Sequence, residues 1–241
     1  MSIDTATLVG ATGGAGTTRL SVEVAATLAR DGRDVAVVDA AYATQGLSHY
    51  VDGRIDPDVT TLVTDEAVGV DDALIDLGVD APGRLAVCPA RAAFEAIARA
   101  KTAVAAERSD EAVRAAADAV DHVVVDAPPV ADNPGVAAVT AADRVGAVTP
   151  ATHRGVDAFQ RLRGRLADVG SEADLVVANR GDDPTGTVDL SVPESAVTRP
   201  ANAPACVDPD PEFAPAVASL AEALFAVSLD LEFPEEGLLS L

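Results

Sequence analysis

A glycine-rich stretch near the N-terminus contains the residue types best suited to binding an anion. Residues 10–19 read Gly-Ala-Thr-Gly-Gly-Ala-Gly-Thr-Thr-Arg and lie between an apolar run and a helix-forming one. Glycines let backbone N–H groups approach an anion closely, and the N-terminus of the next helix adds donors and the positive end of its dipole. The stretch therefore predicts a phosphate-binding loop. The residues expected to bind the ligand are Gly13, Gly14, Ala15, Gly16, Thr17, Thr18 and Arg19.

One interpretation of this loop is a dinucleotide-binding turn. Glycines at positions 10, 13 and 16 form a Gly-x-x-Gly-x-x-Gly pattern, and Asp39 ends the next apolar run. A ribose-binding acid belongs about 20 residues after such a loop. The pattern resembles the short-chain dehydrogenases, but neither Tyr42 nor Tyr50 is followed by the lysine of their Tyr-x-x-x-Lys pair. An NAD(P)-binding Rossmann protein is therefore an alternative that lacks the usual catalytic pair.

The same loop resembles the deviant Walker A motif of the ParA/MinD family of P-loop ATPases, Lys-Gly-Gly-x-Gly-Lys-Thr-Thr. The three glycines of that motif are retained at positions 13, 14 and 16, and Thr18 matches its magnesium-binding threonine. Thr12 and Thr17 replace its two lysines. Because the strict P-loop pattern requires the second lysine, the loop alone does not decide between the two families.

Later segments extend the ParA/MinD resemblance over nearly the whole chain. The Val-rich run that ends at Asp126 resembles the Walker B strand, and the segment that starts at Asp39 resembles switch I. Asn179 resembles the family's adenine-reading asparagine, and Pro193 lies in a segment similar to its base-flanking loop. The resemblance implies ATP or another purine nucleotide as ligand. It also implies Mg²⁺ held by Thr18, Asp39 and Asp126, with the two aspartates as catalytic residues.

Simpler roles remain open for some of these residues. Asp126 is also suited to capping a turn, and Asn179 to forming one. Three arginines, Arg91, Arg154 and Arg180, are interpreted as surface charges.

Three departures from the ParA/MinD pattern predict slow or absent hydrolysis. Thr12 and Thr17 remove two cations, and Ala41 replaces the aspartate that the family associates with the attacking water. Losing one cationic contact to a transferred phosphoryl group costs orders of magnitude in rate. The resemblance then implies a nucleotide-dependent switch or scaffold in partitioning, positioning or regulation, with an unidentified protein partner and a nucleotide-dependent homodimer. A nucleotide-free pseudo-ATPase that binds partners is the alternative.

The elements that must position these residues follow a βα rhythm. Short Val-rich and Ala-rich runs alternate with amphipathic stretches, which predicts an α/β fold, a three-layer sandwich with a mostly parallel sheet. Strands are expected at Thr5–Gly10, Asp34–Asp39, Arg84–Cys88, His122–Asp126, Arg144–Thr149 and Asp174–Asn179. Helices are expected at Thr17–Arg30, Ala92–Ala119, Arg154–Asp168 and Glu212–Val227, with a weaker one at Thr60–Leu77.

No linker divides the chain, so we expect one nucleotide-binding domain over residues 1–228 and a short acidic, apolar tail over 229–241. The tail has acidic rather than basic residues on its polar face, which argues against membrane targeting. Residues 180–211, rich in Pro, Asp and Thr, are expected to form loops around one short strand and to cover a ligand as a lid.

Composition excludes several classes of function. With 39 acidic and 17 basic residues the chain has a formal net charge of −22, which repels phosphate backbones and anionic lipids. Nucleic-acid binding would need a local basic patch or a partner. The balance suits a cytosol of very high salt, of the haloarchaeal type, where charge repulsion is screened. Because no apolar stretch approaches the ~20 residues of a membrane span, we expect a soluble, cytoplasmic protein without direct membrane insertion.

Cysteine and histidine provide no metal-binding pattern. Cys88 and Cys206 lie far apart, and the three histidines are scattered, so we interpret the cysteines as packing residues.

Overall fold

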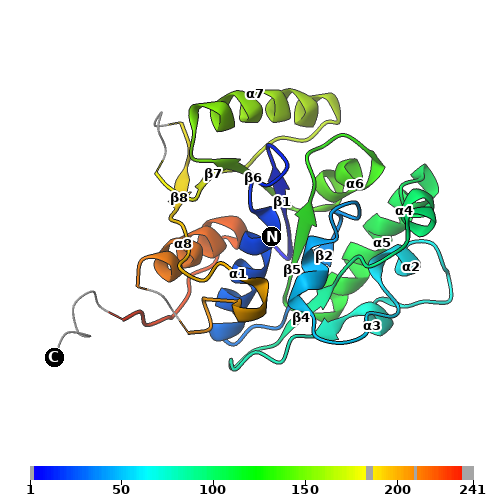
Figure 1. Ribbon diagram of the computed structural model, residues 1–241, viewed down its shortest axis with the longest axis horizontal. Coiled ribbons are helices and arrows are strands. Elements are labelled where there is room, and N and C mark those ends of the chain that lie inside the picture. The colour runs from blue at the N-terminus through cyan, green and yellow to red at the C-terminus, as the bar shows by residue number, and fades with distance from the viewer. Residues whose placement is uncertain (1–2, 183–186, 209–210, 235–241) are drawn as a thin grey trace.

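The computed structural model describes residues 3–182, 187–208 and 211–234 and contains a sheet of eight strands. The strands are β1 (Thr5–Gly10), β2 (Val35–Asp39), β3 (Ile75–Asp76), β4 (Leu85–Cys88), β5 (His122–Ala127), β6 (Arg144–Pro150), β7 (Leu175–Asn179) and β8 (Leu190–Val192). Their order across the sheet is β3-β4-β2-β5-β1-β6-β7-β8 (Figure 1). All neighbours pair in parallel except β3, which is antiparallel to β4. The prediction of an α/β fold with a mostly parallel sheet is confirmed.

Helices cover both faces of this sheet (Figure 1). The α-helices are α1 (Thr17–Arg30), α2 (Val59–Leu62), α3 (Val70–Ala73), α4 (Phe94–Ala100), α5 (Ala103–Ala119), α6 (Asn133–Ala141), α7 (His153–Asp168) and α8 (Phe213–Phe225). Two short 3₁₀ helices, η1 (Gly46–Tyr50) and η2 (Pro200–Asn202), complete the set described. None of the helices in the described ranges is long and apolar enough to span a membrane.

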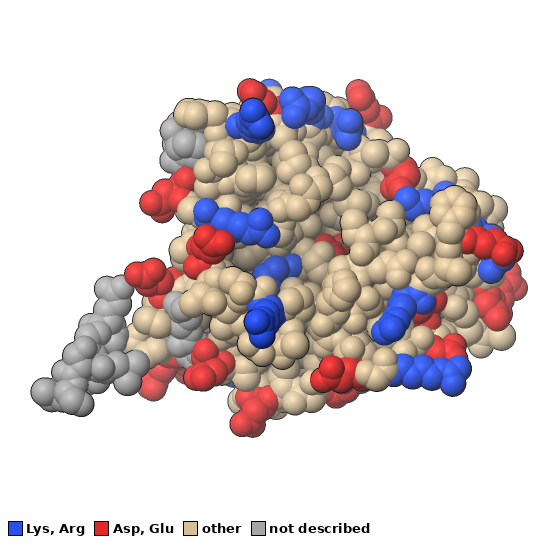
Figure 2. All heavy atoms as spheres, in the orientation of Figure 1, with Lys and Arg blue, Asp and Glu red and all other residues tan. Residues whose placement is uncertain are grey.

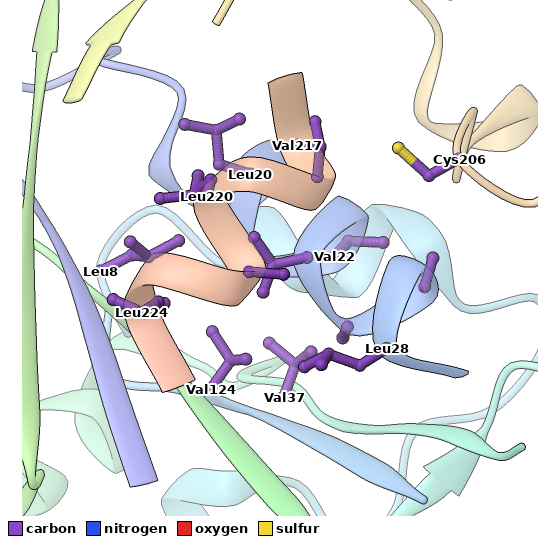
Figure 3. Packing of buried hydrophobic residues seen from close by; sticks show 14 of the residues in the cluster. Leu8, Leu20, Val22, Leu28, Val37, Val124, Cys206, Val217, Leu220 and Leu224 are labelled. Carbon is purple, nitrogen blue, oxygen red and sulfur yellow. The ribbon is translucent and has the colours of Figure 1, made fainter. Parts of the chain in front are cut away.

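Two apolar cores lie on the two faces of the sheet. Figure 3 shows the first core, in which Leu20 and Val22 of α1 and Leu220 and Leu224 of α8 pack over the central strands. The second core lies under α5, α6 and α7. Successive strand residues alternate between the two cores, as Val37 and Val38 of β2 do. Because both faces are covered, the strands read as continuous apolar runs rather than as alternating ones. This architecture is a single-domain three-layer sandwich.

The predicted helix Ala92–Ala119 is wrong as one helix, since it is divided into α4 and α5. Helix α4 ends at Ala100 with Lys101 as its C-cap, and Thr102 is extended with φ −73° and ψ 160°. The Thr102 hydroxyl accepts a hydrogen bond from the Ala105 N–H and so caps a new helix. A threonine that can cap competes with continued helix at this point.

The weaker helix expected at Thr60–Leu77 is also wrong. Asp58 caps the single turn of α2, Gly69 precedes the single turn of α3, and the chain then enters β3. Helix α6 was not predicted, although Asp132 caps it and a proline lies in its first turn. Both are helix-start signals. Strand ends differ from the prediction by one residue at most, and β8 is the short strand expected within residues 180–211.

Parts of two predicted segments lie outside the described residues. These parts are residues 183–186 and 209–210 of the expected lid and residues 235–241 of the expected tail. The described start of the tail contacts the body: the Leu229 N–H donates to the Glu222 carboxylate, and the Asp230 N–H donates to that of Asp31. The Arg30 guanidinium lies 5.4 Å from the centre of the Phe233 ring. The boundary between domain and tail stays a prediction.

Candidate nucleotide site

The glycine loop joins β1 to α1 at the carboxyl end of the sheet. Gly14 and Gly16 have φ angles of 75° and 92°, a backbone region that residues with a Cβ rarely adopt. A Cβ added to Gly13 or Gly14 would meet no atom within 4 Å, so one side of the loop is open. In the described chain no side chain caps α1, which leaves its first N–H groups available. The open backbone and the helix N-terminus together suit an anion.

Two carboxylates, Asp39 and Asp126, lie side by side at the same edge of the sheet. They face each other in the register of β2 and β5, and both are fully buried. Asp39 is held by backbone: Oδ1 accepts from the Ala41 N–H at 2.7 Å and Oδ2 from the Ala90 N–H at 3.1 Å. Neither carboxylate oxygen of Asp126 has a hydrogen-bond partner among the described residues. Of the two buried acids, only Asp39 is thus hydrogen-bonded within the described residues; the hydroxyls of Thr18 and Thr17 lie near Asp126 without forming a hydrogen bond.

Burial raises the pKa of both aspartates. For Asp39, the nearby charge of Asp126 raises the pKa further, and the N–H groups of Ala90 and Ala41 partly oppose the rise. For Asp126, the nearby hydroxyls of Thr18 and Thr17 oppose it. Ionising both carboxylates together is therefore costly unless a cation arrives, because each is desolvated and they repel each other.

The residues around Asp126 fit a magnesium ion. The Thr18 hydroxyl lies near its carboxylate, and Mg²⁺ prefers such oxygen ligands. Gly46 of η1 packs closely over this threonine, since a Cβ on Gly46 would lie 3.1 Å from Thr18 Oγ1. The described residues contain no group of three or more Asp, Glu, His or Cys that could hold a metal. Phosphate oxygens and water would therefore complete the coordination, as is usual for Mg²⁺.

A pocket of about 280 Å³ adjoins the loop at the ends of β7 and β8. Asn179, Arg180 and Pro193 line it, together with Arg19, Leu20, Tyr50, Glu194, Ser195, Val197, Thr198 and Phe213. Asn179 is buried, and its Nδ2 donates to the Ala15 carbonyl at 2.8 Å. A Cβ on Gly16 would lie 2.3 Å from this Nδ2, so Gly16 is needed for the close approach. The structure brings Asn179 and Pro193 into one pocket, and Asn179 contacts the loop; that the two residues bind a base stays a prediction.

Arg19 lies in the wall of this pocket. Its guanidinium donates to Glu23 at 2.6 Å, to the Val197 carbonyl at 2.7 Å and to Ser195 Oγ at 3.3 Å. These bonds connect α1 to the segment after β8. That Arg19 binds a nucleotide stays a prediction, and its place in the structure is the pocket wall.

Some features of the site were not predicted from the sequence. The backbone N–H groups of Ala41 and Ala90 that hold Asp39 have no side-chain signal. Arg180 was interpreted as a surface charge; it is exposed, yet its Nη1 lies 3.4 Å from the Gly14 carbonyl oxygen. Both cysteines are buried and free, as expected for packing residues.

A second, more open groove of about 700 Å³ is lined by residues of α2, α4 and α5 and the turns beside them. It includes no residue of the glycine loop and neither buried aspartate. The smaller pocket is the better candidate, because Asn179 and Arg180 in its wall donate hydrogen bonds to carbonyl groups of the glycine loop.

The strand order distinguishes between the two families considered from the sequence. In the Rossmann fold the first two strands are neighbours, whereas here β5 lies between β1 and β2. Asp39 faces Asp126 and is bonded to backbone, so it is not free to hold a ribose. The NAD(P)-binding alternative does not fit this arrangement.

The sequence matches no protein-family model and no curated protein. Solved structures do match. The septum site-determining protein MinD from Pyrococcus horikoshii OT3, complexed with Mg-ADP, is 20% identical with a TM-score of 0.76 over 91% of this chain and 94% of its own. A chain of the MinC:MinD cell division protein complex of Aquifex aeolicus is 21% identical, with a TM-score of 0.74 over 96% of this chain and 100% of its own. A ParA family ATPase from Chlorobium tepidum TLS is 17% identical, with a TM-score of 0.73 over 90% and 98%. The chain therefore has the fold of the MinD and ParA ATPases.

Proposed function

We propose that this protein binds ATP, or another purine nucleotide, together with Mg²⁺ and acts as a nucleotide-dependent switch in the cytoplasm. The phosphates would lie along Gly13–Thr18, and the base would enter the pocket beside Asn179 and Pro193. Mg²⁺ would be held by Thr18 and Asp126, with Asp39 beside Asp126. It would supply positive charge to the phosphates. The role would be in partitioning, positioning or regulation.

The observation that carries this proposal is the state of Asp126. Its carboxylate is fully buried and forms no hydrogen bond with the described residues, although the hydroxyls of Thr18 and Thr17 lie near it. This arrangement costs free energy in the free protein. A divalent cation brought in by a nucleotide would remove that cost. The open glycine loop and the N-terminus of α1 support the proposal, because phosphates bound there would lie near such a cation.

Hydrolysis is expected to be slow or absent. Thr12 and Thr17 bring no positive charge to the loop. Ala41 is buried, and its N–H is used by Asp39, so no loop lysine acts on the transferred phosphate and no second carboxylate acts on the attacking water. Binding depends less on these groups, because backbone N–H groups supply most of the cradle. The nucleotide would then control which partner, or which second copy, the protein binds.

A nucleotide-free partner-binding module is the competing proposal. It is favoured by the same loss of lysines, and it differs in predicting no measurable affinity for any nucleotide. The buried, unpartnered carboxylate of Asp126 argues for the nucleotide-bound form.

Calorimetric titration in molar KCl, the salt that the acidic composition favours, would test the proposal. The protein would be titrated with ATP, ADP, GTP and NADH, each with and without Mg²⁺, while phosphate release is followed in parallel. We expect magnesium-dependent purine nucleotide binding with little phosphate release. Absence of binding to all four would leave the pseudo-ATPase, and binding of NADH alone would overturn the proposal.

A further inference from the structure

Arg180 is held in an unusual backbone conformation directly after β7. Its φ is 65°, in the left-handed region that residues other than glycine rarely adopt. The N–H groups of Arg180 and Gly181 both donate to the Val192 carbonyl of β8, at 2.9 and 3.2 Å. The sheet edge therefore fixes the point from which the Arg180 side chain leaves the backbone.

The side chain leaves this point toward the glycine loop. Nη1 lies 3.4 Å from the Gly14 carbonyl oxygen, and Nη2 would lie 3.4 Å from a Cβ on Gly16. Arg180 also lines the pocket that contains Asn179. Its guanidinium is thus placed where the pocket meets the loop. Figure 2 shows charged side chains around a hollow near the middle of the face that is in view.

Arg180 forms no ion pair with a carboxylate of the described residues. Within the described ranges eight basic side chains form ion pairs with Asp or Glu, and Arg180 is not among them. Arg19, the other arginine at this pocket, is bound to Glu23. Lys101, the chain's single lysine, is bound to Asp132. Other arginines in the described ranges also form no ion pair, but of these only Arg180 lines the pocket beside the glycine loop.

We propose that Arg180 binds the phosphates of the nucleotide and supplies the positive charge that Thr12 and Thr17 do not. This inference rests on the proposed function. A guanidinium forms charge-assisted, often bidentate hydrogen bonds to phosphate oxygens. Its present bond to a neutral carbonyl is long and is exchanged easily for such a contact. Asn179, the residue before it, would contact the base, so two successive residues would bind the two ends of the ligand.

The test compares Arg180→Gln with the unchanged protein for adenosine, AMP, ADP and ATP, by calorimetry in molar KCl with Mg²⁺. We expect the loss of affinity to grow with the number of phosphates, reaching at least about tenfold for ATP and vanishing for adenosine. Arg180→Lys should keep part of the affinity. Arg163→Gln, on the exposed face of α7, is the matched control and should change nothing.

A rescue experiment makes the assignment specific. Thr17→Lys introduced into Arg180→Gln returns a cation to the loop and should recover ATP affinity. An equal loss for adenosine and ATP, or no loss for ATP, would overturn the inference and leave the proposed function intact. Failure of the unchanged protein to bind any nucleotide would instead overturn the proposed function.

Discussion

Glu23 and Asp126 are both fully buried carboxylates, and their surroundings are opposite. Glu23 in α1 accepts from the Arg19 guanidinium at 2.6 Å and from the N–H groups of Ala205 and Cys206, each at 2.8 Å. Asp126 accepts no hydrogen bond from the described residues. A buried carboxylate is tolerated when donors and a cation surround it. Glu23 is therefore neutralised and hydrogen-bonded within the fold, whereas Asp126 lacks a hydrogen bond from the described residues, as the proposed magnesium site would require.

Removing Glu23 should have the largest effect on stability. Glu23→Ala leaves Arg19 without its carboxylate and frees two N–H groups of the segment after β8. We expect the free energy of unfolding to fall by about 3 kcal/mol, as for other broken buried ion pairs, measured by chemical denaturation in molar KCl. Glu107→Ala, an exposed glutamate on α5, is the control and should stay within about 0.5 kcal/mol. A decrease in the free energy of unfolding below about 1 kcal/mol would mean that the hydrogen bonds and ion pair of Glu23 do not stabilise the fold.

Alanine substitutions at two glycines of the loop, Gly16 and Gly13, should differ in their effect on folding. Gly16→Ala puts a Cβ 2.3 Å from Asn179 Nδ2 at a φ of 92°, so we expect about 2 kcal/mol of destabilisation and loss of ATP binding. Gly13→Ala meets no atom within 4 Å and should fold normally. Thermal unfolding and calorimetry of both variants would check this. Equal behaviour of the two would show that the loop does not depend on the approach of Asn179.

Replacing each buried carboxylate by its amide, in Asp126→Asn and Glu23→Gln, should change stability in opposite directions. Asp126→Asn removes a buried, repelled charge, so the nucleotide-free protein should gain about 1 kcal/mol at pH 7 while magnesium-dependent ATP binding is lost. Glu23→Gln should destabilise, because it removes the partner of Arg19. Denaturation curves and nucleotide titrations of the two variants decide this. Destabilisation by Asp126→Asn would mean that its carboxylate has stabilising partners in the free protein.

The stability of the nucleotide-free protein should also depend on pH, through the two buried aspartates. The pKa values of Asp39 and Asp126 are raised above the ordinary 3.8, so between that value and the raised values the folded state binds more protons than the unfolded state. The free energy of unfolding of the nucleotide-free protein should therefore fall as pH rises from about 4 toward neutrality, by at most about 1.4 kcal/mol per pH unit for each group. The slope should be smaller in Asp126→Asn, and an unchanged slope would count against the raised pKa values.

The glycine loop and the parallel strands could be predicted because their signals are local. Glycines at fixed spacing and Val-rich runs are visible in any short window of the sequence. The division between α4 and α5 was missed because Thr102 competes with an otherwise regular helical pattern. Helix α6 was missed although Asp132 and the proline after it marked its start. Both errors come from giving apolar periodicity more weight than capping residues.

The sequence by itself determined the chemistry available at the site: a backbone anion cradle without lysines and two acids at strand ends. Only the tertiary structure decided how these groups are used. Asp39 and Asp126 face each other because β5 pairs with β2 across a connection of many residues. Arg19 is turned toward Glu23, and Arg180 toward Gly14. The reason is physical: residue type sets what a side chain can bond, while its partner depends on which distant segments the sheet brings within reach.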